Sequence, residues 1–452
     1  MEPGGPAAPA EAQQAGENPH RGGQHYRPAA APLIASLSQP VTHIVGAGLA
    51  GLACAVELAA AGRAVMLHEA ALQAGGRCRS FHDPLLDRVI DNGNHLLLGA
   101  NHHALAYLDR IGGRAALESS ERVELPFHDL ASGEGWVLRP GHGPGWIFDP
   151  ARRVPGTRWW DYLRPLALPL HGRQARVVDV LAMDSPIGQR LWQPLTIAIL
   201  NTAPAAASAA LLWSVFRRTL LKGPAACRPY FAGAAGLSGA FIDPALAWLR
   251  ARDVPLHVGH RLRGLTIQAG RVVALDFNDG PVGLGPQDRV VLALPAPVTA
   301  ELLPGLTVPL DHGAILNAHF RLPVPVPSLP PFIGLVGGVA EWLFRRGDVL
   351  SVTVSAADRW MEQPSEALAT LLWADIARLL GTPTAPCPPC RIIKERRAGF
   401  AATPANAAQR PGARVPGLDN MLLAGDWTDT GLPATIEGAV LSGQRAARLV
   451  QT

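Results

Sequence analysis

Near the start of the chain, three glycines and one acidic residue have the types and the spacing of a dinucleotide-binding site. Gly46, Gly48 and Gly51 follow the pattern G-x-G-x-x-G, and Glu69 lies 18 residues after Gly51. The first glycine of this pattern permits a tight turn, the second lets the backbone approach a pyrophosphate, and the third lets a helix pack closely on a strand. A carboxylate at the position of Glu69 can hydrogen-bond ribose hydroxyls. These residues therefore predict that the chain binds a dinucleotide.

A Gly-Gly-Arg segment follows shortly after the acidic residue. Gly75 and Gly76 let the backbone pass close to a ligand, and Arg77 supplies positive charge for phosphate or flavin oxygens. A surface turn with solvated arginines is the alternative interpretation of this segment.

Another candidate segment lies near the C-terminus, where residues 423–438 read LAGDWTDTGLPATIEG. An apolar strand ends in Gly425 and Asp426, a loop rich in turn residues follows, and a helix begins close to Glu437. The N–H groups of a helix N-terminus favour negative charge on a ligand. The segment therefore predicts that a carboxylate and a helix N-terminus lie at the same ligand site.

The elements that must position these residues can be predicted from the hydrophobic pattern. Residues 42–45 form a short apolar strand, residues 49–61 form a helix that Gly62 ends, and residues 64–68 form a second strand before Glu69. This strand, turn, helix and strand unit is typical of a Rossmann-type domain.

Two distant segments complete the predicted α/β domain. Residues 254–280 alternate like paired strands, and residues 288–304 add a strand that ends in Ala-Leu-Pro. At the C-terminus, a strand over 421–424 and a helix over 435–450 close the unit. The fold class predicted is therefore α/β, with a Rossmann-type domain built from discontinuous segments and an interleaved α+β substrate domain.

Composition excludes several function classes. The 452 residues are 48% hydrophobic and 17% charged, which fits a globular enzyme with a large core. The net charge of +4 comes from dispersed arginines without a basic block, so we expect no nucleic-acid partner. No cluster of metal-ligand spacing stands out, and no metal site is predicted.

The cysteines and the N-terminal residues point to the cytoplasm. Five cysteines without a disulfide rhythm are typical of a reducing compartment. The CPPC sequence at 387–390 lies in a proline-dense run, which favours a plain connection over a redox motif. Residues 1–40 have the composition of a disordered tail and contain no secretory signal.

The Gly-Gly-Arg segment and the C-terminal Gly-Asp with its helix resemble the amine oxidase and phytoene desaturase superfamily of flavoproteins. The resemblance implies that the cofactor is FAD, that Asp426 binds its ribitol, that N–H groups near Glu437 and Gly438 stabilise the reduced ring, and that the backbone near Leu262 contacts the adenine. The cofactor residues implied are Gly46, Gly48, Leu49, Ala50, Gly51, Glu69, Gly75, Gly76, Arg77, Asn92, Gly93, Leu262, Gly425, Asp426, Thr435, Ile436 and Gly438.

Four longer phrases narrow the resemblance to one family. IDNGNHLLLGAN, WQPLTIAILNTAPAAASA, GLVGGVAEWLFRRGDVLSVTVSAAD and LAGDWTDTGLPATIEGAVLSG are similar to the squalene-associated flavoproteins known as hydroxysqualene dehydroxylases, from bacterial hopanoid synthesis. The likeness runs from Val41 to Val450. It implies that the hydroxyl of a long apolar polyprenyl alcohol leaves as water and that hydride from reduced FAD quenches the allylic cation, giving squalene.

The resemblance also implies a division of the chain and a candidate acid. The FAD domain is expected over 41–110, 225–301 and 411–452, and the substrate domain over 111–224 and 302–410. His95 is the candidate general acid for the leaving hydroxyl. The alternative interpretation is that His95 caps a turn or is hydrogen-bonded in the core.

The uncharged run at 193–216 leaves three interpretations open: a buried helix, the wall of an apolar substrate tunnel or a monotopic membrane patch, and a membrane-spanning helix. The sequence Thr202-Ala-Pro204 within it resembles a helix start. A peripheral membrane location at the cytoplasmic face follows from a squalene-like substrate. An unidentified electron donor and association with other squalene-synthesis enzymes are the further partners expected.

Three rival functions also stay open. A carotenoid or squalene desaturase would use the same scaffold with electrons flowing the other way. An amine oxidase is disfavoured because Ala434, Thr435 and Ile436 stand where that class has an aromatic residue, although Trp427 lies nearby. A non-catalytic flavoprotein that carries a polyprenyl lipid is the third rival.

Overall fold

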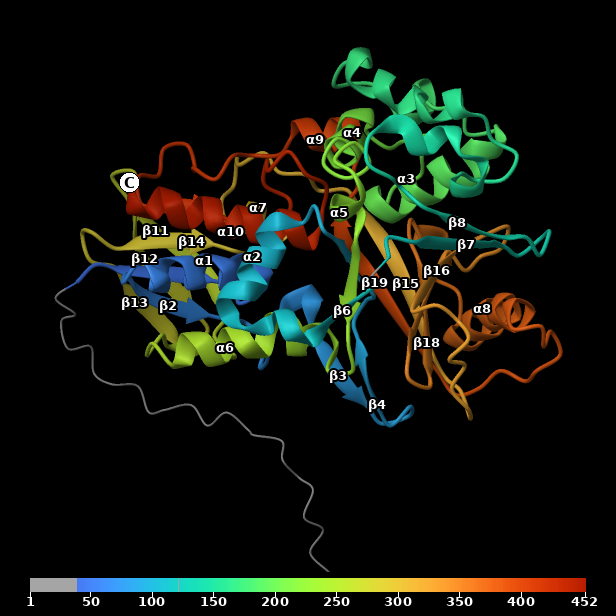
Figure 1. The fold of residues 1–452 in the computed structure, drawn as a ribbon. Helices are drawn as coiled ribbons and strands as arrows, with labels where there is room; N and C mark the ends of the chain where they lie inside the picture. The colour runs from blue at the N-terminus through green and yellow to red at the C-terminus, as the bar shows by residue number, and fades with distance from the viewer. Residues whose placement is uncertain (1–38, 121) are drawn as a thin grey trace, which may run out of the picture. The chain divides into compact units, whose positions relative to one another are not determined.

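The computed structural model of the protein describes residues 39–120 and 122–452 (Figure 1). Apart from its last two residues, the predicted N-terminal tail at 1–40 lies outside the described residues. The secondary structure divides into one parallel sheet with its helices, a larger mixed sheet and several small sheets.

The parallel sheet joins five strands that come from distant parts of the chain. In spatial order they are β10 (Leu256–His257), β2 (Ala64–His68), β1 (Val41–Val45), β14 (Arg289–Leu292) and β20 (Met421–Leu423). All four neighbouring pairs run parallel. Every residue of β1 is buried, as expected for a central strand that is covered on both faces. The predicted Rossmann-type α/β fold, assembled from discontinuous segments, is confirmed.

The two ends of the chain meet beside this sheet. Helix α1 (Leu49–Ala60), near the start, and helix α10 (Ile436–Gln451), at the end, lie in contact, in blue and red in Figure 1. A Cβ atom added to Gly443 of α10 would lie 2.1 Å from the carbonyl oxygen of Ala50. Only glycine therefore lets the two helix backbones approach so closely.

Three more helices and a small antiparallel sheet, here called the ribbon, lie around the parallel sheet. The helices are α2 (His102–Ile111), α6 (Asp243–Arg250) and α7 (Ala296–Leu302). The ribbon is an antiparallel sheet of β11 (Leu262–Gln268), β12 (Arg271–Phe277) and β13 (Gly280–Gly283). These strands account for the alternating pattern at 254–280.

The larger sheet contains seven strands and binds helix α8 (Ser365–Leu379) on one face through an apolar core. In spatial order the strands are β19 (Cys390–Phe400), β15 (His312–Arg321), β18 (Val349–Val354), β17 (Trp342–Arg346), β16 (Phe332–Val336), β7 (Leu125–Asp129) and β8 (Gly135–Leu138). All of them fall in the two segments predicted for the substrate domain.

Small sheets join the two larger ones. One pairs β3 (Ser80–Asp83) with β4 (Arg88–Asp91), and the other contains β5 (Leu96–Leu98), β9 (Pro229–Ala232) and β6 (Leu117–Ser119). The remaining short helices are α5 (Pro224–Cys227) and α9 (Pro404–Ala408).

The uncharged run at 193–216 forms two helices of eight residues each, α3 (Gln193–Leu200) and α4 (Ala209–Phe216). The predicted helix start at Thr202–Pro204 is wrong, because Ser208 caps α4 through its hydroxyl, which accepts from the N–H of Leu211. Among the described residues, every helix is too short or too polar to cross a bilayer. The membrane-spanning interpretation is therefore contradicted.

Candidate active site

The glycine pattern forms the turn between β1 and α1. Gly46 has a φ of +107°, and a Cβ atom there would lie 2.4 Å from the carbonyl oxygen of Ala293. A Cβ atom on Gly51 would lie 1.8 Å from the carbonyl oxygen of Gly46. These two glycines are therefore required by packing between the turn, the helix and the neighbouring strand.

Gly48 differs from its neighbours because a Cβ atom there would meet open space. The N–H groups of Gly48, Ala50 and Gly51 donate to no acceptor in the described part of the chain. Free N–H groups at a helix N-terminus, beside space that a side chain would fill, suit the binding of a pyrophosphate. The residues present therefore fit a dinucleotide.

Glu69 lies at the end of β2 and supports the same turn. Its carboxylate accepts from the N–H groups of Ala47 and Ala71, both at 2.8 Å. Carboxylates accept several hydrogen bonds, so Glu69 keeps capacity for ribose hydroxyls. Two residues before the buried Leu262, the backbone N–H of His260 donates to the carbonyl oxygen of Glu69 at 2.9 Å, which places the start of β11 beside the end of β2.

The Gly-Gly-Arg segment lies against the glycine turn. Gly75 donates to the carbonyl oxygen of Ala47 at 2.8 Å, and a Cβ atom on Gly76 would lie 3.4 Å from the Cα atom of Gly48. Both residues have positive φ angles, of +113° and +55°. The segment therefore packs against the glycine turn, and its part in cofactor binding stays a prediction.

Arg77 joins the two ends of the site. Its guanidinium lies 2.8 Å from both carboxylate oxygens of Asp426, 349 residues along the chain. The Asp426 side chain is buried, whereas 45% of the Arg77 side chain is accessible. The negative charge of Asp426 raises the pKa of Arg77, so the guanidinium stays charged at neutral pH. A cation that is accessible yet paired with a buried anion can contact an anionic ligand.

The loop that carries Asp426 is held by Arg410, which sequence reasoning missed. This arginine is 7% exposed and donates to the carbonyl oxygens of Asp426, Trp427 and Thr428. Burial lowers the pKa of Arg410 to about 10, which leaves it charged at neutral pH. No local sequence signal could have indicated this role, since the contacts depend on the fold of the loop.

The start of α10 presents two free N–H groups. The hydroxyl of Thr435 caps the helix by accepting from Gly438, and the N–H groups of Ile436 and Glu437 have no acceptor among the described residues. The Glu437 side chain points elsewhere: its carboxylate accepts from His103 and Ala104 at the start of α2. Only the backbone of this turn is therefore available to a ligand.

The residues before β5 form a polar network with the larger sheet. Asn317 donates to the carbonyl oxygen of Asn92 at 3.3 Å, and Thr353 bridges the side chains of Asn317 and Asn94. A Cβ atom on Gly93 would lie 3.3 Å from the Asn317 amide. Asn92 and Gly93 are thus fixed by the fold.

His95 follows this network and differs from a satisfied core histidine. Its half-buried ring forms no hydrogen bond with any described residue. Burial is the main cause that lowers the pKa of His95 to about 4; the charge of Asp91 opposes the shift and that of Arg77 adds to it. The ring is therefore neutral at pH 7 and has a free N–H to offer a ligand.

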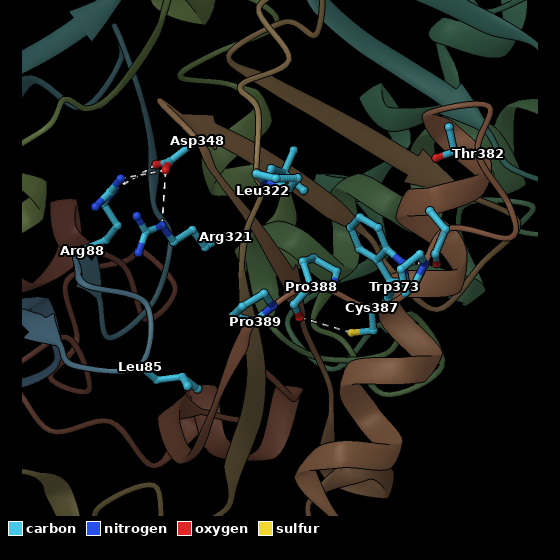
Figure 2. Close-up of a pocket in the computed structure, with 13 residues that line it drawn as sticks. Leu85, Arg88, Arg321, Leu322, Asp348, Trp373, Thr382, Cys387, Pro388 and Pro389 are labelled. Atoms are coloured by element: carbon cyan, nitrogen blue, oxygen red, sulfur yellow. Dashed lines mark hydrogen bonds and ion pairs between the residues drawn. The ribbon is translucent and has the colours of Figure 1, made fainter.

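A separate pocket lies at the far end of β15 (Figure 2). It has a volume of about 780 Å³, and Figure 2 shows Arg88 and Arg321 beside Asp348 on one side and Trp373 with Cys387 on the other. At about 3.4 Å per residue, the ten residues of β15 separate this pocket by about 30 Å from His312. His312 is near enough to Arg77 and Asp426 for their charges to modify its pKa, which burial chiefly lowers.

The CPPC segment beside this pocket has no feature of a redox site. Cys387 and Cys390 are free thiols, and burial raises the pKa of both, that of Cys390 to about 12. A reactive cysteine needs a lowered pKa. Among the described residues, no group of three or more His, Cys, Asp or Glu side chains could hold a metal ion.

The fold and the site define a flavin-dependent oxidoreductase. Residues 49–182 and 198–451 match the family of flavin-containing amine oxidoreductases. The structure is also similar to that of cyclohexylamine oxidase from Brevibacterium oxydans, with a TM-score of 0.65 and 15% identity, covering 91% of this chain and 98% of that one. FAD is accordingly the cofactor, and the glycine turn, Arg77 and the start of α10 fit it.

Two curated relatives place the chain more closely. It is 49% identical over 411 residues to a hydroxysqualene dehydroxylase of Rhodopseudomonas palustris and 44% identical over 409 residues to one of Sinorhizobium fredii. Each match covers 90% of this chain and 97% of the relative. The chain therefore belongs to the hydroxysqualene dehydroxylase family, and the predicted resemblance is confirmed.

Proposed function

We propose that this protein converts hydroxysqualene to squalene and water by reduction with FAD. The observation that carries the proposal is the 49% identity to the Rhodopseudomonas palustris hydroxysqualene dehydroxylase over nearly the full length of both chains. The overall change takes up two electrons and two protons: the C–O bond breaks, a C–H bond forms, and the oxygen leaves as water. When bound in its reduced form, FAD supplies the hydride.

The residues that would hold FAD follow from the site. The free N–H groups at the start of α1 would bind the pyrophosphate, and Glu69 would bind the adenosine ribose. Arg77 and Asp426 would bind the middle of the cofactor as one charged pair. The N–H groups of Ile436 and Glu437 would stabilise negative charge on the ring.

His95 would act on the substrate hydroxyl. Because the ring is neutral at pH 7, we expect its N–H to orient the hydroxyl through a hydrogen bond. This role differs from proton donation by an imidazolium, which the low pKa disfavours. Apolar surroundings would keep water away from the cationic carbon.

The geometry of the site also bears on the rival functions. Trp427 is buried, its indole N–H donates to the carbonyl oxygen of Leu294, and its ring packs on Gly425, so it supplies no aromatic wall for an amine. A desaturase would share the site, and reaction direction is what separates it from the dehydroxylase. A lipid carrier would leave the flavin unchanged.

One experiment separates these functions. The purified protein is reduced without oxygen, hydroxysqualene is added, and flavin absorbance and product mass are followed together. We expect reoxidation in proportion to squalene formed. Binding without reoxidation would favour the carrier, and reduction of oxidised protein by a polyene would favour the desaturase.

The location and partners belong to the same proposal. A substrate of this kind dissolves in membranes, which supports peripheral association with the cytoplasmic face of a bilayer. An electron donor must reduce FAD before each turnover, and a neighbouring enzyme of squalene synthesis would supply the alcohol. Co-purification with an added reductase would test the donor.

A further inference from the structure

One surface segment of the protein exposes six large apolar side chains within 23 residues of sequence. Residues 144–171 contain the 3₁₀ helices Pro144–Phe148, Trp159–Tyr162 and Arg164–His171, which lie beside α3 and α4 in teal and green in Figure 1. The aromatic-leucine face consists of Phe148, Trp159, Trp160, Leu163, Leu166 and Leu170. Each of these residues is between 39% and 81% exposed, and exposed apolar side chains that gather in one place often mark an interaction surface.

The rings of this face form one patch. The centroids of Phe148 and Trp159 are 5.3 Å apart, and those of Trp159 and Trp160 are 5.5 Å apart. The exposed leucines follow directly along the next two 3₁₀ turns. The three rings therefore form one cluster, and the exposed leucines follow it directly in the sequence.

The opposite side of the same segment already supplies the core. Trp146, Leu168 and Val177 are buried, and Tyr162 packs against Trp192 of the helix before α3. The Tyr162 hydroxyl also accepts from the N–H of Val154 at 2.8 Å. The inner contacts fix the orientation of the short helices, so the outer apolar side chains are not needed for the core.

The segment that carries the face has a net positive charge. Residues 148–179 contain six arginines and three aspartates, a net charge of +3. Arg176 pairs with Asp179, whereas the guanidinium groups of Arg158, Arg164 and Arg173 form no ion pair in the part of the chain that the structure describes. The Arg158 guanidinium lies over the ring of Trp160, 5.1 Å from its centroid. Tryptophan, leucine and unpaired arginine together are the composition of a surface that binds anionic bilayers.

We propose that the aromatic-leucine face docks the protein onto an anionic lipid bilayer, with its apolar side chains in the interface and the arginines at the headgroups. The proposal rests on the function proposed above, because a polyprenyl substrate is held in the bilayer. Pairing of two copies through this face is disfavoured, since a two-fold axis would bring the unpaired arginines of both copies together. The earlier candidate for membrane contact, residues 193–216, exposes no large apolar side chain.

Vesicle co-flotation tests the proposal. We expect the FAD-loaded full-length protein to bind vesicles of phosphatidylcholine with 30% phosphatidylglycerol at least tenfold more strongly than vesicles of phosphatidylcholine alone, and to lose most of this binding in 1 M salt. The triple variant Trp159→Ser, Trp160→Ser and Leu170→Ser should bind at least tenfold more weakly. Replacement of Arg158, Arg164 and Arg173 by Gln should remove only the preference for anionic lipid.

A matched control uses exposed apolar residues elsewhere. The triple variant Leu72→Ser, Leu310→Ser and Val324→Ser removes side chains of comparable exposure and should bind vesicles like the unchanged protein. All variants must retain FAD and their thermal midpoint. Equal vesicle binding by the Trp and Leu variant would overturn the proposal, as would conversion of a dimer to a monomer by that variant with vesicle binding intact.

The result of the docking test can be distinguished from the result of the test of the proposed function. Vesicle binding is measured without substrate, and turnover is measured in detergent, where docking is not required. Loss of docking in a variant that still turns over in detergent supports the docking proposal alone. Tight docking by a protein that never forms squalene would contradict the function and leave the docking surface standing.

Discussion

Arg77 and Asp426 are the two residues on which closure of the flavin site depends most. Each belongs to a different end of the chain, and each carries a charge that the other neutralises at 2.8 Å. Gly48 is the third critical residue, because the space beside it is where the pyrophosphate would lie. These three positions allow direct tests by substitution.

Replacement of Gly48 by Val should abolish flavin retention. The added side chain would fill the space beside the free N–H groups of α1, so the pyrophosphate could not approach the backbone. Flavin absorbance of the purified variant measures the effect, and we expect less than about a tenth of the normal content, which corresponds to a loss of more than about 1.4 kcal/mol in binding. Gly283→Val on β13, where a Cβ atom also meets open space, is the matched control. Normal FAD content in the Gly48 variant would refute the site.

Replacement of Arg77 by Met should weaken FAD binding and destabilise the protein. The buried Asp426 carboxylate would lose its cation, a change that costs about 1–3 kcal/mol when a buried group is left unsatisfied. Arg77→Lys should give an intermediate effect, since it keeps the charge without the planar fork. Fluorescence titration with FAD and thermal melting measure both effects. Arg88→Met, which breaks an ion pair at the remote pocket, should leave FAD affinity unchanged.

Replacement of His95 by Ala should slow turnover while FAD content stays normal. Loss of one hydrogen bond to a reacting group typically costs about 1–3 kcal/mol, or roughly 5 to 150-fold in rate. His95→Gln should restore part of the rate, because an amide also donates. Since the pKa of His95 is about 4, the rates of the normal protein and the Ala variant should change in parallel between pH 6 and pH 8. An unchanged rate in the Ala variant would exclude His95 from the reaction.

Among the elements, β1, β2 and the loop after β10 carry a buried chain of histidines beneath the ribose end of the site. His68 lies 3.1 Å from His43 and 2.9 Å from His260, measured between ring nitrogens. The ring of His260 also lies 2.7 Å from the Asp279 carboxylate, and the backbone N–H of His260 donates to the carbonyl oxygen of Glu69. The cluster therefore couples the acidic residue of the dinucleotide site to the sheet beneath it.

This cluster predicts acid sensitivity. Burial, together with the neighbouring His43, lowers the pKa of His68 to about 2, so the unfolded chain binds a proton below pH 6.5 that the folded chain does not. The free energy of unfolding should therefore fall as the pH falls through 6.5. In His68→Gln the slope below pH 6 should decrease by up to about 1.4 kcal/mol per pH unit. Chemical denaturation at several pH values measures it, with the exposed His82→Gln as control; equal slopes would contradict the assignment.

At the scale of the whole molecule, local motifs predicted the parts of the site that depend on nearby sequence. Gly46, Gly48 and Gly51 are recognisable because one turn and one helix require them in a fixed order. The helix start at Thr202–Pro204 was wrong because Ser208, further along, makes the capping hydrogen bond. Short-range signals therefore predicted element type better than element boundary.

The long-range features could not be predicted. The bond between Arg77 and Asp426 and the carbonyl contacts of Arg410 exist only once the chain has folded. Gly399 is a further case, since a Cβ atom there would lie 2.6 Å from the Ala434 side chain, beside the start of α10. The aromatic-leucine face differs from buried runs of similar composition only in that its side chains are exposed to solvent. The sequence alone does not show which apolar side chains are exposed.

The central claim is that the protein reduces its substrate at the carbon that loses oxygen. A single turnover in D₂O by protein reduced beforehand without oxygen tests this claim most directly, with the product analysed by mass spectrometry and NMR. We expect squalene that carries one deuterium at the carbon that bore the hydroxyl, in an amount equal to the flavin reoxidised. Squalene without deuterium at that carbon, or flavin reoxidation without squalene, would contradict it.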